Sequence, residues 1–270
     1  MEKSATSSAV YALDARSCES GERVVSSPST TGPWGPDAQH GGPVSALLGR
    51  AVERLAASTG GGVVGRIGVD LLGPVPVSTL EVDASVLRPG RSVRLLGAEL
   101  RDPLRGRTVA SARAWVLPEH EDGPGEVGPA PRHRPGDGEV RGRPEGWHAG
   151  YLDAIEWRWI DGGLDRPGPG TVWMRPPALV EGETISPLQR VLACVDSASG
   201  VSAGLDIRRW AFLNTELTVH QLRPLEGEWV AVEAETTLGP GSVGVCTARV
   251  SDERGLVARS AQTLLVVPRE

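Results

Sequence analysis

The sequence is poor in cysteine, in lysine and in aromatic residues other than tryptophan. Its 270 residues include three cysteines, one phenylalanine and two tyrosines, against eight tryptophans. Cys18, Cys194 and Cys246 are odd in number and far apart, which fits neither a disulfide framework nor a metal site. The cysteines therefore predict free thiols in a reducing cytoplasm and no bound metal.

Long apolar runs and an excess of positive charge are also missing. The first ten residues lack the apolar core of a signal peptide, and no run approaches membrane-spanning length. The chain has 28 basic and 34 acidic residues, a formal net charge of -6, which argues against a nucleic-acid partner. These absences favour a cytoplasmic globular protein, and the chain is long enough for two modest domains.

Two similar series of elements follow one another, each with one amphipathic helix before several strands. A stretch rich in Pro, Gly, Glu and Arg, residues 118–150, separates them and has the composition of a linker. A helix followed by an antiparallel sheet is typical of an α+β unit. The expected elements are a strand at 10–15, a helix at 43–57, strands at 63–72, 80–87, 93–100, 108–117, 154–160 and 171–174, a helix within 186–200, and strands at 212–222, 229–236, 243–250 and 257–267.

The two series repeat the same turn sequences. The first contains LRPGRSV, RDPLRG and a strand that ends in VLP, and the second contains LGPGSVG, SDERG and a strand that ends in VVP. An internal duplication explains this agreement, and a repeated unit that cannot cover its own sheet should pack against its twin. We therefore expect an N-terminal unit over residues 1–117 and a C-terminal unit over 151–270.

The second unit carries polar residues where the aligned first unit has apolar or small ones. Asp196 directly follows the apolar stripe of the second helix, and Gln262 lies within the last strand. Asn214 and Thr218 are expected on one face of a neighbouring strand because an even number of steps separates them. These groups could hold a water molecule, with the Asp196 carboxylate as the general base that takes its proton. A buried hydrogen-bond network that serves packing alone is the alternative interpretation.

The first unit contributes a different candidate, the start of its helix. Backbone amides of Gly41 and Gly42 at a helix N-terminus favour negative charge and could stabilise an oxyanion. His40 is a general base, a substrate contact or a residue near the helix cap. Trp34 is either the wall of a binding channel or the anchor of its loop.

Five segments resemble the actinobacterial thioesterase-like proteins of the acyl-CoA thioesterase II superfamily. They read GPWGPDAQHGGPVSALLGRA, RIGVDLLGPVPVSTLEVDASVLRPGRSV, TVWMRPPALVEGETISPLQRVLACVDSASGVS, FLNTELTVHQLRPLEGEWV and GLVARSAQTLLVV. The resemblance implies an α+β protein of two fused hotdog folds, each an antiparallel sheet wrapped around one long helix. It also implies a water-activating aspartate at Asp196 and a glutamine at Gln262. Asn214 stands where the family has a threonine, with Thr215 adjacent.

The resemblance further implies an enzyme that hydrolyses acyl thioesters of coenzyme A or of an acyl carrier protein. Asp196 would be the general base, with Gln262 and Asn214 or Thr215 positioning water. No metal or redox cofactor is implied, because coenzyme A or phosphopantetheine is part of the substrate. Two alternatives are a non-hydrolytic tailoring enzyme, dehydratase-like or cyclase-like, of a secondary-metabolite pathway, and a catalytically inactive acyl-binding protein. Exposed edge strands make a homo-oligomer an expectation. The expected substrate contacts are Trp34, His40, Gly41, Gly42 and Thr218.

Overall fold

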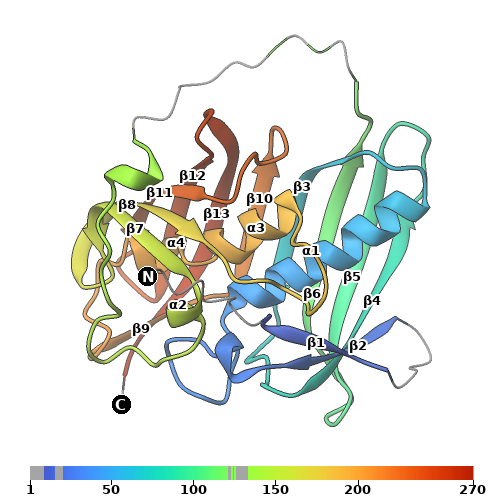
Figure 1. Cartoon of the computed structure of the whole chain (residues 1–270). Coiled ribbons are helices and arrows are strands. Elements are labelled where there is room, and N and C mark those ends of the chain that lie inside the picture. Colours follow the sequence, from blue (N-terminus) through green and yellow to red (C-terminus); the bar gives the residue numbers. More distant parts are fainter. Residues whose placement is uncertain (1–8, 16–20, 121–122, 124, 126–132, 270) are drawn as a thin grey trace, which may run out of the picture.

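One large antiparallel sheet and two packed helices dominate the structure, a computed structural model that describes residues 9–15, 21–120, 123, 125 and 133–269 (Figure 1). Within these ranges, no helix combines the length and the apolar character needed to cross a membrane. The elements are β1 (Tyr11–Asp14), β2 (Glu22–Ser26), η1 (Pro28–Thr30), α1 (Gly41–Ser58), β3 (Val63–Leu71), β4 (Thr79–Arg88), β5 (Arg94–Asp102), β6 (Arg107–Leu117), η2 (Pro135–Asp137), α2 (Tyr151–Ala154), β7 (Glu156–Gly163), β8 (Arg166–Arg175), α3 (Pro187–Val195), α4 (Ala198–Val201), β9 (Trp210–Asn214), β10 (Glu216–Gln221), β11 (Val230–Leu238), β12 (Val243–Ser251) and β13 (Leu256–Pro268).

The strand order shows the duplication directly. It runs β1-β2-β4-β5-β6-β3 in the first half and β10-β13-β12-β11-β8-β7 in the second, with β9 paired to β13. The order β2-β4-β5-β6-β3 is thus repeated in reverse as β10-β13-β12-β11-β8. The halves join where β3 pairs with β10, with Val69 opposite Leu217 and Ile67 opposite Val219. The expected pair of helix-and-sheet units is therefore confirmed, and the two sheets are continuous.

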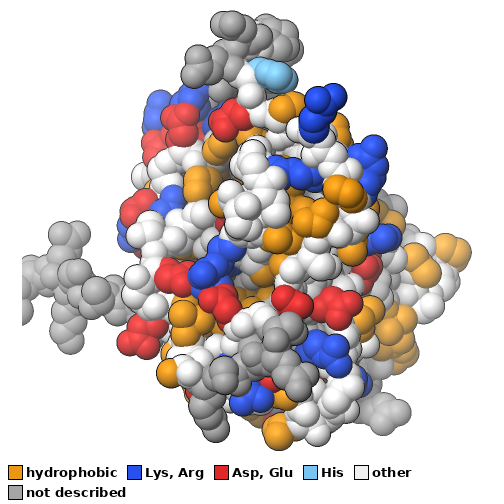
Figure 2. Space-filling model, turned by 90° about the vertical axis from the view of Figure 1, so that its right-hand side faces the viewer, with side chains coloured by type: hydrophobic (Ala, Val, Ile, Leu, Met, Phe, Trp, Pro, Cys, Tyr) orange, Lys and Arg blue, Asp and Glu red, His pale blue; other side chains and the backbone are white. Residues whose placement is uncertain are grey.

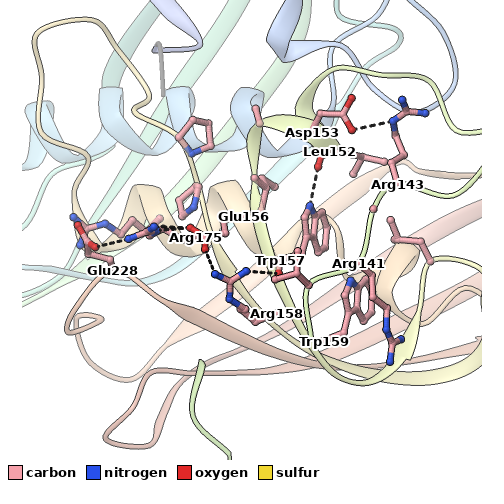
Figure 3. A pocket seen from close by; sticks show the side chains of 18 of the residues that line it. Arg141, Arg143, Leu152, Asp153, Glu156, Trp157, Arg158, Trp159, Arg175 and Glu228 are labelled. Atoms are coloured by element: carbon pink, nitrogen blue, oxygen red, sulfur yellow. Dashed lines mark hydrogen bonds and ion pairs between the residues drawn. The ribbon is translucent and has the colours of Figure 1, made fainter. Parts of the chain in front are cut away.

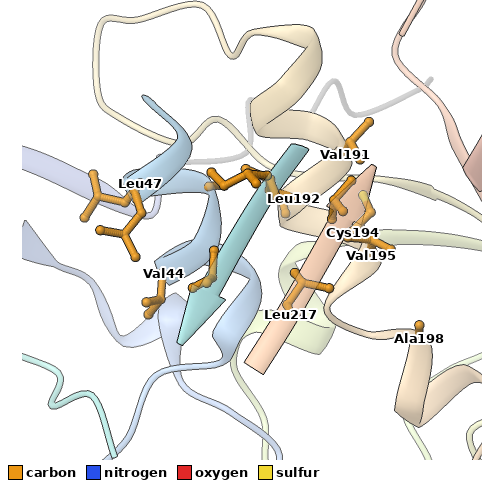
Figure 4. Packing of buried hydrophobic residues seen from close by; sticks show 14 of the residues in the cluster. Val44, Leu47, Val191, Leu192, Cys194, Val195, Ala198 and Leu217 are labelled. Atoms are coloured by element: carbon orange, nitrogen blue, oxygen red, sulfur yellow. The ribbon is translucent and has the colours of Figure 1, made fainter. Parts of the chain in front are cut away.

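Helices α1 and α3 lie side by side on one face of this sheet and run in opposite directions (Figure 1). The start of α1 meets the end of α3, because a Cβ on Gly42 would lie 2.5 Å from the Ala193 carbonyl oxygen. Farther along, a Cβ on Gly49 would lie 2.4 Å from Leu192 Cδ1. Glycine at both positions therefore permits the close helix crossing. The apolar faces meet in one buried core (Figure 4), to which Val44, Leu47, Val191, Leu192, Val195 and Leu217 contribute.

The two helices begin with different caps. The Ser186 side chain accepts from Gln189 N, and the Gln189 side chain accepts in return from Ser186 N, with Pro187 at the first helical position. This helix start is confirmed. The first helix begins at Gly41 and not at residue 43, because His40 Nδ1 accepts the Gly42 N–H and caps the helix.

The expected single strand over 212–222 is wrong, because it is split into β9 and β10. Asn214 lies opposite Leu264 and Thr218 opposite Ala261, so the strand has one residue more than its partner between these pairs. Such a bulge reverses the alternation of side chains. Asn214 consequently points toward the helices, whereas Thr218 lies on the outer face, between the buried neighbours Leu217 and Val219. The expectation that Asn214 and Thr218 share a face is therefore wrong.

Part of the stretch expected to be a linker is packed. Trp147 is 6% exposed and belongs to the core, and Glu139 pairs with Trp159 at the edge of the sheet. Residues 121–122, 124 and 126–132 of that stretch lie outside the described residues. Two further details differ from expectation: α2 occupies the start of the strand expected at 154–160, and β2 was not predicted.

Charges of both signs are mixed on the surface. On the face shown in Figure 2, acidic and basic side chains are interspersed, with hydrophobic side chains between them. Some charged side chains of the described residues are ion-paired across neighbouring strands, for example Arg23 with Glu81 and Arg175 with Glu156. Partly exposed pairs of this kind contribute little to stability, so the fold depends on the buried core.

Candidate active site

Asp196 lies where the N-terminus of α1 faces the C-terminus of α3. It is the C-cap residue of α3 and is 4% exposed. The dipole of α3 disfavours a negative charge at this end, and the dipole of α1 favours it. A Cβ on Gly41 would lie 2.5 Å from Asp196 Oδ1, so the carboxylate rests against the first turn of α1. Only glycine fits at position 41 without displacing it.

Two side chains contact the two carboxylate oxygens of Asp196. Asn214 Nδ2, at the end of β9, donates to Oδ1 at 2.6 Å. His40 Nδ1 lies 3.0 Å from Oδ2. Hydrogen bonds to an ionised acceptor are stronger than those between neutral groups. The structure thus brings three predicted site residues, from both halves of the chain, together at one carboxylate.

His40 has two neighbours for a single ring nitrogen. Its Nδ1 accepts the Gly42 N–H at 3.0 Å and lies equally close to Asp196. A ring nitrogen either accepts or donates, so a proton on Nδ1 would exchange the Gly42 contact for one with the carboxylate. The Tyr151 ring packs on the imidazole with the centroids 5.1 Å apart, and its hydroxyl donates to the Ala193 carbonyl. Burial is the largest cause that raises the pKa of Tyr151 well above its usual value, which keeps this hydroxyl a donor.

The two glycine amides differ in their surroundings. The Gly42 N–H is taken by His40, and Gly42 does not line the cavity described below. The Gly41 N–H has no acceptor in the described part of the chain, and Gly41 lines the cavity beside Asp196. The expectation that both amides contact a substrate is therefore reduced to Gly41.

Gln262 and Thr218 lie outside the cavity. Gln262 is 1% exposed, and its Nε2 donates to the backbone carbonyl of Asp196 at 3.0 Å. Its Oε1 has no hydrogen-bond partner among the described residues. Gln262 thus fixes the end of α3 and does not touch the carboxylate. Thr218 donates to Glu216 on the outer face of the sheet, so its position does not support the expected substrate contact. Thr215 lines the exposed rim of the cavity.

Asp196 opens into a cavity of about 370 Å³ with an aromatic wall. This volume is at the lower end of small-molecule sites. Trp34 stands edge-on to Phe212 with the centroids 5.1 Å apart, and Trp147 lies within 6.3 Å of both rings. Trp34 lines this cavity, in the position of a channel wall, which is one of the two roles expected for it. Trp147 and Phe212 were not predicted; a tryptophan within a Pro- and Gly-rich stretch was the available signal for Trp147.

The other ends of the two helices form a related but closed arrangement. Ser186 Oγ and Gln189 Nε2 donate to the Glu53 carboxylate at 2.8 Å. Burial raises the pKa of Glu53 more than these hydrogen bonds lower it. Arg50, one helical turn away, is 1% exposed and is ion-paired with two glutamates. Neither Glu53 nor Arg50 lines the Asp196 cavity, so this second carboxylate is not part of the Asp196 site.

Two family descriptions match the chain. Residues 30–117 match the acyl-CoA thioesterase N-terminal domain, and residues 130–266 match the acyl-CoA thioesterase C-terminal domain. No curated protein sequence matches the chain.

Several solved structures share the fold. A conserved protein of unknown function with a hot dog fold from Alicyclobacillus acidocaldarius is 15% identical, with 98% of this chain and 97% of that chain covered and a TM-score of 0.76. A protein described as a thioesterase II from Thermobifida fusca is 22% identical, with coverage of 93% and 94% and a TM-score of 0.74. The tesB protein of Mycobacterium avium is 16% identical, with coverage of 95% and 96% and a TM-score of 0.64. At these identities the comparisons show the fold, two hotdog units in one chain, as expected.

Proposed function

The chain belongs to the acyl-CoA thioesterase family, and we propose that it hydrolyses acyl thioesters in the Asp196 cavity. One observation carries the choice of site: a buried carboxylate, which accepts from Asn214 and lies 3.0 Å from His40 Nδ1, faces an apolar cavity at the N-terminus of α1. A carboxylate in such a position is suited to take a proton from water beside a bound thioester.

In the proposed reaction, Asp196 is the general base. It takes one proton from a water molecule, the water oxygen bonds to the thioester carbonyl carbon, and the carbonyl electron pair moves onto its oxygen. When this pair returns, the carbon–sulfur bond breaks and the proton on Asp196 passes to the leaving sulfur. A carboxylic acid and a free thiol are released, and the Asp196 carboxylate is restored.

The residues around Asp196 stabilise the oxyanion that forms in this reaction and position the carboxylate. The Gly41 N–H and the dipole of α1 face the cavity and stabilise the oxyanion. Asn214 fixes one oxygen of the carboxylate and Gln262 fixes the Asp196 backbone carbonyl, while His40 donates to the other carboxylate oxygen when its Nδ1 carries a proton. Asn214 stands where the family resemblance implies threonine. Its amide reaches the carboxylate itself, which assigns it to positioning the base.

The thioester carrier is either coenzyme A or the phosphopantetheine arm of an acyl carrier protein. The mouth of the cavity is marked by its exposed lining residues, Pro74, Leu213, Thr215 and Leu265, so the arm would leave past them. The test compares one acyl group on coenzyme A and on a carrier protein, with free thiol and free carboxylic acid measured together. Stoichiometric release of both products supports hydrolysis, and release of neither contradicts it.

The contact between His40 and Asp196 favours one second candidate, a dehydratase-like or cyclase-like tailoring reaction. A histidine and a carboxylate 3.0 Å apart in one cavity can serve as an acid and base pair. The same experiment separates the two functions, because a tailoring reaction changes the mass of the acyl group while its thioester stays intact. Binding without any product would instead identify a catalytically inactive acyl-binding protein.

A further inference from the structure

Leu152 and Leu164 separate the Asp196 cavity from a larger neighbouring groove. The groove measures about 1200 Å³ and lies along β7 (Figure 3). Its lining and that of the 370 Å³ cavity have only these two leucines in common. The small cavity and the larger groove therefore adjoin at these two side chains.

The two leucines are held by neighbouring backbone elements. Leu152 belongs to α2 and is 4% exposed, and its carbonyl accepts the Trp157 indole N–H at 2.7 Å (Figure 3). Leu164 is in the turn between β7 and β8. It reaches Gly200 of α4, where an added Cβ would lie 3.4 Å from Leu164 Cδ2 and 3.6 Å from the Trp147 ring. The inner end of the cavity is therefore closed by packed side chains.

This inner end lies close to the reacting groups. Gly200 follows Asp196 by four residues, and both residues line the same cavity of about 370 Å³. An acyl group whose carbonyl sits at Asp196 and whose tail runs along α4 therefore meets Gly200 and Leu164 after a few carbon atoms or one ring.

The chemistry of the wall is apolar and aromatic. The ionisable side chains of the cavity lining are Asp196 and His40, both used in the proposed reaction. The Arg269 guanidinium lies over the Trp34 ring, 5.8 Å from its centroid, and supports this side of the wall. No cationic side chain is left in the lining to compensate a second carboxylate on the acyl group. Flat aromatic walls favour planar or compact groups.

We propose that Leu152 and Leu164 set the size limit of the substrate, and that the enzyme accepts short or ring-sized uncharged acyl groups, aromatic ones included. This inference rests on the proposed hydrolysis at Asp196. Long straight chains are excluded by the two leucines, although the groove behind them has room for such chains.

The first test compares acetyl-, hexanoyl-, benzoyl-, succinyl- and palmitoyl-CoA by free thiol release. From acetyl to hexanoyl, kcat/KM should rise by about fourfold for each buried methylene. Benzoyl-CoA should be a good substrate, and palmitoyl-CoA and succinyl-CoA should be about 100-fold poorer than hexanoyl-CoA. Equal turnover of palmitoyl-CoA and hexanoyl-CoA would overturn the size limit.

The second test moves the limit in both directions. Leu164→Ala should join the cavity to the groove and raise kcat/KM for palmitoyl-CoA at least tenfold, with Leu152→Ala as an independent second opening. Gly200→Val should fill the inner end and reduce turnover of hexanoyl- and benzoyl-CoA more than that of acetyl-CoA. The matched control is Leu104→Ala, which removes the same atoms from an 84% exposed leucine away from both spaces. An unchanged chain-length profile in folded Leu164→Ala and Leu152→Ala would overturn the proposal.

Calorimetric binding separates failure of this inference from failure of the proposed function. If the wild-type protein releases no thiol from any thioester, the proposed function fails. The inference still requires tighter binding of benzoyl-CoA than of palmitoyl-CoA, and it requires Leu164→Ala to reduce that preference. Equal affinities in both proteins would overturn the size limit independently of catalysis.

Discussion

Asp196 is held in a buried position by groups from both halves of the chain. His40 and Gly41 come from the first half, and Asn214 and Gln262 from the second. Burial of an ionised carboxylate is costly unless hydrogen bonds and favourable dipoles compensate it. The site therefore requires both halves, and each contact makes a testable contribution.

Gly41→Ala should displace the Asp196 carboxylate, because the new Cβ would lie 2.5 Å from its Oδ1. A shift of about 1 Å in a reacting group can reduce the rate about 100-fold, and we expect kcat to fall by this order. Gly35→Ala is the matched control, since a Cβ at that position meets no atom within 4 Å. Wild-type kcat in Gly41→Ala would show that the carboxylate is not constrained by α1. Steady-state thiol release gives both values.

Two substitutions separate the capping role of His40 from its contact with Asp196. His40→Ala removes both, so the unfolding free energy should fall by about 1 kcal/mol and kcat by at least tenfold. His40→Asn restores a good helix cap, so its thermal stability should return to near the wild-type value while kcat stays low. Thermal unfolding and thiol release measure the two effects. If His40→Asn regains full activity, His40 serves only to cap α1.

At the scale of elements, the duplication appears again in two buried aspartates. Asp102 and Asp252 occupy corresponding turns, β5–β6 and β12–β13, and both are 0% exposed. Each accepts backbone N–H groups of its own turn, from Leu104 in the first half and from Gly255 in the second. Each therefore fixes the hairpin that aligns the last two strands of its unit.

Asp252 should make the stability of the protein depend on acidic pH. Burial raises the pKa of Asp252. Hydrogen bonds from Arg223 and from the N–H groups of Glu226, Arg254 and Gly255 lower it by more, so the pKa falls to about 2. An unfolded aspartate titrates near pH 3.9, so the contribution of Asp252 is complete above about pH 4 and is lost as the pH falls toward 2. Asp252→Asn should lose roughly 3 kcal/mol of stability at neutral pH.

Thermal unfolding between pH 2 and 7 tests this contribution. The Asp252→Asn variant should differ from wild type by less at pH 2 than at pH 7. The exposed residue Asp37 provides the control, and Asp37→Asn should follow the wild-type curve. A constant difference between wild type and Asp252→Asn across this range would contradict the account.

The elements that sequence periodicity predicted well are those with long regular patterns. The capped helix from Pro187 and the strands of both units follow from apolar spacing and turn residues. The bulge at Thr215 could not be predicted, because one extra residue changes the face of a side chain without changing composition. The proximity of His40 to Asp196 could not be predicted either, because it arises only when α1 and α3 are packed. Trp147 lies in a stretch whose composition indicated a linker.

At the scale of the whole molecule, the continuous sheet and the antiparallel helix pair make the two halves interdependent. The strands β3 and β10 pair across the junction, and α1 packs on α3. We expect one cooperative thermal transition with equal calorimetric and van't Hoff enthalpies. Residues 30–117 alone would expose the β3 edge and the apolar face of α1, and should not fold independently. Two separate transitions would contradict this dependence.

The central claim is that Asp196 supplies the base for thioester hydrolysis, and its most direct test is thiol release by Asp196→Asn. The substitution keeps the size of the side chain and removes the negative charge. We predict a loss of 10²-fold or more in kcat, of the order that general bases contribute, with thermal stability and affinity for hexanoyl-CoA retained. Asp206→Asn, at an exposed aspartate outside the cavity, is the control and should match wild type. Wild-type turnover by Asp196→Asn would contradict the account.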